Sequence, residues 1–157
     1  MEFENVIRER HSTRKFKNEK IKREQLEKIL EAGRLAPTAK NIQPIKIYVV
    51  ENNLEGIDKA SPCRYQAPTV LVVCGDKNLA FQKGDYSTYE MDACIVATHM
   101  MLEATNIGVS NIWIEMFDEN VLREELKLPD NIVPVCLLPN TDAFLNKDNC
   151  SSIGISL

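Results

Sequence analysis

The sequence predicts an α+β fold in a single domain. Segments with helical and strand periodicity are interspersed, the strands are few, and one central helical segment is far longer than the rest. A doubly wound sheet would alternate strands and helices more regularly. The length of 157 residues suffices for one hydrophobic core, and 44% hydrophobic with 27% charged residues is ordinary globular composition. We therefore expect residues 1–139 to form one domain. Residues 140–157 form an atypical tail of little periodicity, which is part of the same domain, poorly ordered, or crosses to a partner.

The amino-terminal part predicts two amphipathic helices, both facing the core. Their apolar residues keep helical spacing, at Phe3, Val6, Ile7, Leu26, Ile29 and Leu30. The second helix ends before the loop "LAPTAKNIQP" (35–44), because a residue that precedes proline is driven out of helical geometry. Two β-branched runs follow, "IKIYVV" (45–50) and "TVLVVC" (69–74). The second run is nearly continuous and predicts a central strand.

Residues 86–107 contain neither proline nor glycine and predict the longest helix, with Gly108 at its end. Apolar residues cover more than one of its faces, so this helix either crosses the core or packs on a second subunit. A short strand at 111–114, a helix at 119–126 capped by Asp118 and a last strand at 132–138 complete the domain. Pro134 within the last strand suits an edge or a bulge.

The charge distribution favours a small anionic ligand. The net charge is −4, yet residues 8–28 hold nine Lys and Arg against four Asp and Glu, which leaves −9 for the rest of the chain. A local basic zone on an acidic body suits one compact anion better than a nucleic acid, whose binding needs many phosphate contacts along an extended face. We expect no nucleic-acid partner.

The remaining composition predicts a cytoplasmic protein with reduced thiols and no membrane span. No apolar run approaches the roughly 18 residues of a membrane span, and residues 1–5 lack the order of a signal peptide, so we expect a cytoplasmic protein. The five cysteines are odd in number and form no C-x-x-C pair. Three of them, Cys74, Cys94 and Cys136, lie in apolar segments, where cysteine usually acts as a small hydrophobe. Two histidines give a zinc cluster almost nothing to build on.

The stretch "RHSTRKF" (10–16) predicts an anion clamp. In an extended backbone Arg10, Ser12 and Arg14 project to the same side. Two guanidinium groups offer paired, permanently charged donors, and a hydroxyl adds a neutral one, which together suit phosphate oxygens. Spacing alone also fits a solvated basic turn.

Four segments in order make the pattern specific. The arginine-serine-arginine opening is followed by "LAPTAKNIQP" (35–44), by "MDACIVATHMMLEATNIGVSNIWIEMF" (91–117) and by "LREELKLPDNIVPVCLLP" (122–139). Together they resemble the nitroreductase family of flavin enzymes, over about residues 3–139. The resemblance implies a mostly antiparallel sheet flanked by helices, with the long helix at the interface of a homodimer that binds one FMN in each of two interfacial sites.

The resemblance also implies which residues bind FMN. The phosphate and ribityl chain would be held by Arg10, His11, Ser12 and Arg14. The flavin would be approached from the partner subunit by Pro37, Thr38 and Asn41. Along the isoalloxazine edge, with an N–H directed towards N5, would lie the backbone of Trp113, Ile114 and Glu115.

The implied function is hydride transfer from NADH or NADPH through flavin N5 to a nitroaromatic, a quinone or a similar small acceptor, in a ping-pong cycle. The cofactor carries the chemistry, so no protein catalytic residue is expected. Lys40 is a candidate for positive charge near the reduced flavin, or simply an exposed lysine. One alternative is a non-catalytic flavin-binding or sensor protein of the same fold, and another is a basic arm that binds RNA.

Three further features leave alternatives open. The tail lacks the leucine-glycine-tyrosine-proline-like turn and the basic residue that complete the phosphate site in the family, so either Lys147 substitutes or FMN is held more weakly. The aromatic residues Trp113 and Phe117 line a substrate slot or fill the core. The carboxylates of Asp76, Asp85 and Asp92 suggest a metal, but their scatter favours capping and solvation.

Overall fold

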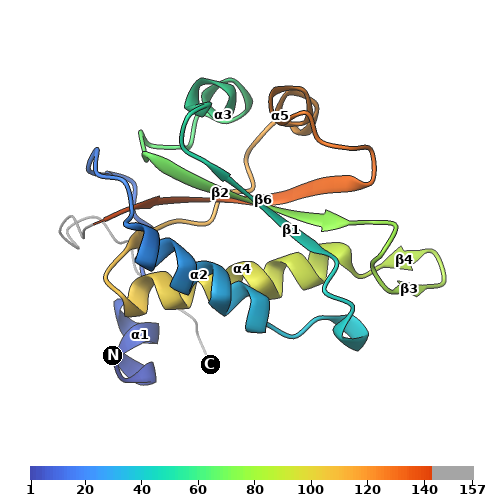
Figure 1. Ribbon diagram of the computed structural model, residues 1–157, viewed down its shortest axis with the longest axis horizontal. Coiled ribbons are helices and arrows are strands. Elements are labelled where there is room, and N and C mark those ends of the chain that lie inside the picture. Colours follow the sequence, from blue (N-terminus) through green and yellow to red (C-terminus); the bar gives the residue numbers. More distant parts are fainter. Residues whose placement is uncertain (143–157) are drawn as a thin grey trace, which may run out of the picture.

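The computed structural model, described here over residues 1–142, is a four-stranded antiparallel sheet with helices on both faces (Figure 1). Its strands are β1 (Ile45–Val50), β2 (Thr69–Asp76), β5 (Ser110–Asn111) and β6 (Ile132–Thr141), in the order β1-β2-β6-β5. Every pairing within the sheet is antiparallel. The predicted α+β class and the mostly antiparallel sheet are confirmed.

Two helices cover each face of the sheet. On one face lie α2 (Arg23–Leu35) and α4 (Tyr89–Asn106), and on the other lie α3 (Leu54–Ala60) and α5 (Glu119–Leu126) (Figure 1). The short helix α1 (Phe3–Glu9) packs beside the carboxyl end of α4, where the amino terminus donates to Asn106 Oδ1 at 2.8 Å. The 3₁₀ turn η1 (Ala39–Asn41) and the hairpin β3 (Gln82–Lys83) and β4 (Tyr86–Ser87) lie at the opposite end.

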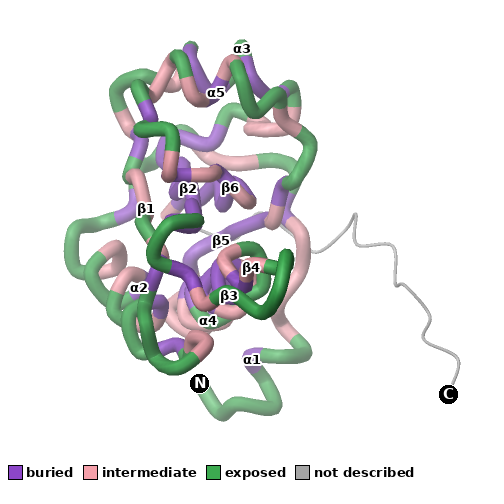
Figure 2. Tube along the Cα trace, turned by 90° about the vertical axis from the view of Figure 1, so that its right-hand side faces the viewer, coloured by how far each residue is buried: buried purple, intermediate pink, exposed green. Residues whose placement is uncertain are grey.

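Strand β2 is the centre of the core, as its sequence predicts. All eight of its residues are buried, and its side chains alternate between the two helical layers. Leu71 and Val73 join the cluster under α2 and α4, whereas Val70 and Val72 join the cluster under α3 and α5. Figure 2 shows the same buried band along β2 and β6. Each such side chain contributes about 1.5–3 kcal/mol when fully buried.

Two predicted boundaries are corrected. The long helix begins at Tyr89 rather than at residue 86, because Tyr86 and Ser87 pair with Lys83 and Gln82 in the hairpin. The predicted strand at 111–114 is two paired residues, Ser110–Asn111, followed by a single bridge from Ile114 to Leu137. Local periodicity does not reveal either, because both depend on pairing partners.

The prediction that α1 faces the core is wrong for two of its three apolar residues. Val6 is 4% exposed, but Phe3 is 66% and Ile7 54% exposed. The helix packs on α4, and Val6 is the one residue of its seven that is buried. Phe3 and Ile7 remain as an apolar surface next to α4.

Two local predictions are confirmed. Asp118 caps α5, because its Oδ1 accepts from the Val121 amide at 3.1 Å. Pro134 falls at a bulge, since the register between β2 and β6 shifts between Val73 and Cys74. Because the regular pairing is already interrupted at a bulge, a proline there removes no backbone hydrogen bond of the strand ladder.

The start of α4 is pressed against β2 at Gly75, which yields a stability prediction. A Cβ at Gly75 would lie 2.7 Å from both Cβ and Cδ2 of Tyr89, and a Cβ atom cannot swing aside. Gly75→Ala is therefore expected to lower the free energy of unfolding by about 1–3 kcal/mol. The control is Gly56→Ala, which gains helix propensity and whose new Cβ would meet two flexible side-chain ends, Asn53 Nδ2 at 2.8 Å and Glu125 Oε2 at 2.9 Å, and Glu125 Cβ only at 3.0 Å. Urea unfolding measures both variants, and an equal loss of unfolding free energy in Gly75→Ala and Gly56→Ala would contradict the packing argument.

The buried cysteines are expected to be unreactive in the folded protein. Cys74 and Cys136 are fully buried, and burial raises the pKa of the Cys74 thiol to about 12 and that of Cys136 further. Their predicted role as small hydrophobes is confirmed, whereas Cys94 is only partly buried. Alkylation followed by peptide mass spectrometry should label Cys63 under native conditions, and Cys74 and Cys136 only in denaturant. Native labelling of Cys74 would show that β2 opens locally.

Candidate functional site

The segment that carries the clamp is extended and lies against β5. The Thr13 amide donates to the Asn111 carbonyl at 3.0 Å, and Thr13 itself is buried. On either side of it Ser12 is half-buried and Arg14 is exposed, while Arg10 is half-buried at the end of α1. His11 is held locally, with Nδ1 2.9 Å from the Glu9 carbonyl oxygen. The backbone is therefore fixed by Thr13, and the flanking side chains are nearer to solvent.

Arg10 and Arg14 differ from the other arginines in their partners. Five of the seven arginines form ion pairs: Arg8 with Glu4, Arg23 with Glu27, Arg34 with Glu31, Arg64 with Asp58 and Arg123 with Glu119. Arg10 and Arg14 form none with any residue of 1–142. Two guanidinium groups four residues apart thus keep their donors available, which a phosphate site requires.

The second predicted part of the site, the loop at 37–43, is anchored to the beginning of α4. Ala39 donates its amide to Asp92 Oδ1 at 2.8 Å, and Thr88 Oγ1 donates to Asp92 Oδ2 at 2.9 Å. The Gln43 amide donates to Thr38 Oγ1 at 2.9 Å, which closes the loop on itself. Asp92 is almost fully buried, and its carboxylate holds the loop at 37–43 against the beginning of α4.

The loop backbone is strained. Lys40, Asn41 and Gln43 all have positive φ, at 52°, 55° and 59°. Left-handed backbone costs a residue other than glycine about 1–2 kcal/mol, although asparagine tolerates it better. Such strain persists only where surrounding contacts fix the conformation, and here Asp92 and Thr38 supply them.

The clamp and the loop lie at opposite ends of α4. Asn111, which holds the clamp segment, donates its Nδ2 to the Met101 carbonyl at 3.4 Å and to Thr105 Oγ1 at 3.3 Å, near the carboxyl end of the helix. The loop is bound at its amino end through Asp92. The 18 residues of α4 span about 27 Å. Within one chain the structure does not bring these two groups of predicted residues together (Figure 1).

The third predicted part, Trp113 to Glu115, runs beside β6. Ile114 exchanges both backbone hydrogen bonds with Leu137, at 2.9 and 2.8 Å, so its N–H is already used. The amides of Trp113 and Glu115 form no hydrogen bond within residues 1–142. An N–H for a ligand would therefore come from one of these two.

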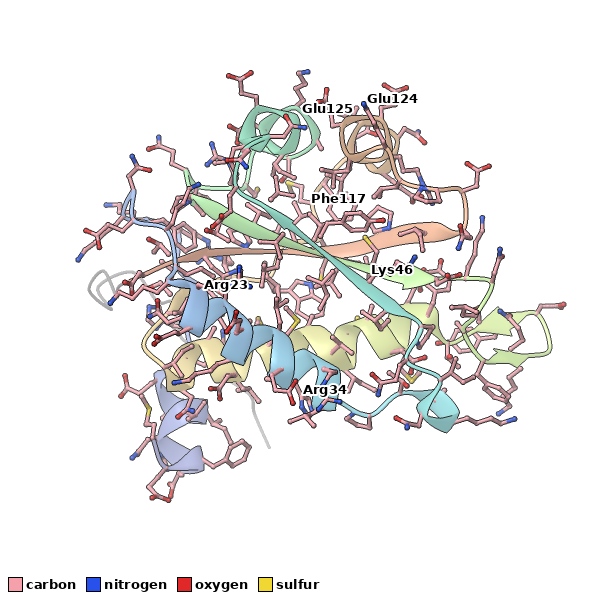
Figure 3. The ribbon with its side chains drawn as sticks, viewed as in Figure 1. Arg23, Arg34, Lys46, Phe117, Glu124 and Glu125 are labelled. Carbon is pink, nitrogen blue, oxygen red and sulfur yellow. The ribbon has the colours of Figure 1, made fainter. Side chains whose placement is uncertain are left out.

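Trp113, Phe117 and Asp76 make contacts within the fold, and both aromatic residues are only partly buried. Trp113 packs on the cluster under α4, and Phe117 lies between the sheet and the α3 and α5 layer (Figure 3). Asp76 accepts from the amides of Asn78 and Leu79 and from Asn131 Nδ2, which confirms its capping role. Within residues 1–142, no three His, Cys, Asp or Glu side chains are grouped so as to hold a metal ion.

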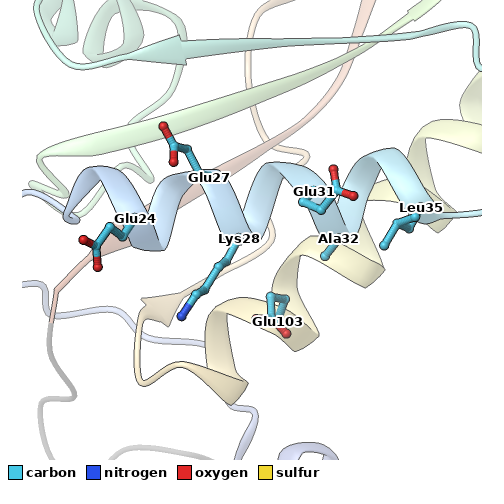
Figure 4. Close-up of a pocket in the computed structure, with 7 residues that line it drawn as sticks. All are labelled: Glu24, Glu27, Lys28, Glu31, Ala32, Leu35 and Glu103. Atoms are coloured by element: carbon cyan, nitrogen blue, oxygen red, sulfur yellow. The ribbon is translucent and has the colours of Figure 1, made fainter.

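An open groove between α2 and α4 contains none of the predicted site residues (Figure 4). Its volume is about 600 Å³, and its lining residues are Glu24, Glu27, Lys28, Glu31, Ala32, Leu35 and Glu103. Of its four glutamates, Glu27 and Glu31 are paired with Arg23 and Arg34, which leaves Glu24 and Glu103 against Lys28. The groove therefore offers no concentration of positive charge for an anionic cofactor. Separately, none of the helices in the described part of the chain combines the length and apolar character that crossing a bilayer requires.

Sequence reasoning missed two contacts that shape the site. The first is the Asp92 anchor, which joins positions 53 residues apart. The second is the contact of Lys40 Nζ with the Phe81 ring, 4.1 Å from its centroid. No local pattern signals either contact. The tail with Lys147 lies outside the described residues.

Comparison with known proteins decides the family. A model of the nitroreductase family matches residues 7–63 and 62–139. The chain belongs to the nitroreductase family. The match covers the clamp segment, the loop at 37–43, α4 and β6 as far as residue 139, so the family resemblance of the sequence is confirmed.

The relatives indicate the kind of chemistry. A provisionally named NADH dehydrogenase/NAD(P)H nitroreductase of Archaeoglobus fulgidus is 31% identical over 137 residues, which cover 82% of this chain and 78% of the relative. A nitroreductase family protein of Clostridium difficile has a TM-score of 0.89 at 33% identity, over 95% of this chain and 88% of that one. An FMN-dependent nitroreductase of the same species has a TM-score of 0.77 at 27% identity, over 90% and 88%. The family and these names together support an oxidoreductase.

Proposed function

We propose that this protein is an FMN-dependent oxidoreductase that transfers hydride from NADH or NADPH to a nitroaromatic, a quinone or a similar acceptor. One observation carries the proposal. In a chain of the nitroreductase family, Arg10 and Arg14 are the two arginines without an ion pair among residues 1–142, and they flank Ser12 on a backbone fixed to β5.

The residues fit a flavin mononucleotide. Arg10, Ser12 and Arg14 supply charged and neutral donors for a phosphate that carries about two negative charges. The amides on either side of Ile114 supply donors beside β6 for a polar ring edge. The acidic body of the protein leaves the clamp as the local positive zone, which attracts the anion.

A homodimer would complete the site. The loop at 37–43 is anchored at Asp92, and the clamp segment is held through Asn111 at Met101 and Thr105, about 14–20 Å further along α4. Pro37, Thr38 and Asn41 would therefore reach a flavin bound to the partner subunit instead. Exposed apolar side chains lie near both ends of α4, with Met91 at its beginning and Phe3 and Ile7 of α1 beside its carboxyl end, and they would contact that partner. Surfaces of this kind mark subunit contacts.

When bound, FMN supplies the hydride-accepting and hydride-donating chemistry of a ping-pong cycle. The chain holds the phosphate at Arg10 and Arg14 and presents an amide of Trp113 or Glu115 to the flavin ring. The Asp92 anchor keeps the loop of the partner in place. No proton transfer by a side chain is required.

The test is a titration of purified protein with FMN, followed by NADH or NADPH oxidation with a neutral quinone present. Repeated turnover is expected. Oxidation that stops after one equivalent per flavin would favour a flavin-binding or sensor protein. A protein that binds no FMN at all would refute the proposal.

A further inference from the structure

Lys40 is held in an unusual way. Its backbone is left-handed, with φ 52° and ψ 19°, and its ammonium lies over the face of Phe81, 4.1 Å from the ring centroid. The residue is exposed, and it forms no ion pair with residues 1–142. It therefore presents a positive charge beside a flat apolar ring.

The loop does not need a lysine at this position. Its conformation is set by the bonds from Ala39 to Asp92 and from Gln43 to Thr38, neither of which uses the Lys40 side chain. A glycine would adopt the left-handed backbone without the cost of about 1–2 kcal/mol that lysine bears. Residues kept in strained conformations cluster at ligand-binding sites. The presence of a lysine side chain at position 40, where the loop itself does not need one, therefore points to a ligand.

The Phe81 ring and the Lys40 ammonium together indicate the kind of ligand that this part of the loop would bind. A cation over an exposed aromatic face gains only about 0.5–1 kcal/mol, so the ammonium can turn to a stronger partner without a large loss. The buried carboxylate of Asp92, which anchors this loop, already accepts two hydrogen bonds, from Ala39 and Thr88. Since Lys40 forms no ion pair within residues 1–142, its ammonium is available to an anionic group of a bound molecule, whose aromatic part can pack near Phe81.

We propose that Lys40 selects electron acceptors that carry an anionic group, such as nitroaromatic carboxylates. This inference rests on the proposed function, in which the loop that carries Lys40 lies beside the flavin of the partner subunit. The carboxylate contacts the ammonium while the nitroaromatic ring lies towards the flavin. Lys40 acts in binding and takes no part in proton transfer.

The test compares Lys40→Met with the wild type and with Lys40→Arg. The acceptors are 4-nitrobenzoate and 4-nitrobenzyl alcohol, which differ in charge and little in shape. The kcat/KM for 4-nitrobenzoate divided by that for 4-nitrobenzyl alcohol is expected to fall at least about tenfold in Lys40→Met, which corresponds to about 1.4 kcal/mol. In Lys40→Arg this ratio should be largely retained. A second readout needs no turnover: benzoate, added to the oxidised FMN-loaded protein, should perturb flavin absorbance with an affinity that falls in Lys40→Met alone.

The alternative outcomes are distinct. An unchanged ratio, or an equal loss for both acceptors, overturns the selection by charge. A change in the preference for NADPH over NADH without a change in the acceptor ratio assigns the lysine to the donor and also overturns it. Absence of FMN-dependent turnover in the wild type refutes the proposed function itself, and this inference with it.

Discussion

Asp92→Ala is expected to lower the free energy of unfolding by about 2–4 kcal/mol and to weaken FMN binding as well. The carboxylate is almost fully buried and accepts from the Ala39 amide and the Thr88 hydroxyl. Hydrogen bonds to a charged group contribute about 1.5–3 kcal/mol each, and their loss here leaves two donors without partners. Part of the loss is offset because a buried charge is removed. Urea unfolding gives the stability, and flavin fluorescence gives the affinity.

Asp92→Asn is the matched control. Its carbonyl oxygen can still accept from Ala39, and its amide can donate to Thr88 Oγ1, so both contacts survive without the charge. We expect a loss of no more than about 1 kcal/mol. If Asn and Ala destabilise equally, the contribution of Asp92 is the charge itself and not the anchoring of the loop at 37–43.

The parts of the fold that hydrophobic pattern decides could be predicted from the sequence. The continuous apolar run of β2 identified the central strand, and Asp118 identified the cap of α5, because both signals are local. Pro134 marked the bulge in β6 for the same reason, since a missing amide has the same consequence in any sheet.

The parts that depend on distant partners could not. Tyr86 and Ser87 have side chains compatible with the helix that follows, and only pairing with residues 82–83 makes them a strand. Phe3 and Ile7 carry the periodicity of a buried helix, but periodicity gives the apolar side of a helix and not what covers it. Their exposure is understandable if α1 is at a subunit contact.

The candidate site divides in the same way. The residue types in "RHSTR" indicate an anion site from their chemistry alone. Their separation along α4 from the loop at 37–43 appears only in three dimensions, as does the Asp92 anchor. The sequence therefore predicts the candidate groups of the site, whereas the structure shows that one chain alone does not assemble them.

Arg14→Ala is expected to weaken FMN binding at least tenfold, and the double variant Arg10→Ala/Arg14→Ala about 100-fold or more. One charge-assisted hydrogen bond to a phosphate contributes about 1.5–3 kcal/mol, which corresponds to roughly tenfold to a hundredfold in affinity. Neither arginine has an ion pair among residues 1–142 whose loss would unfold the chain. Binding is measured by flavin fluorescence, and riboflavin, which lacks the phosphate, should bind wild type and variants alike.

Arg8→Ala is the control for charge alone. Arg8 lies two residues before Arg10, and its substitution removes the same charge. Unlike Arg10 and Arg14, it pairs with Glu4, at 2.7 Å, on the exposed side of α1. Such exposed pairs contribute at most about 1 kcal/mol, so FMN affinity should change less than threefold. If Arg8→Ala and Arg14→Ala weaken binding equally, the effect is the general field of the basic segment, because a clamp requires the loss to be confined to Arg10 and Arg14.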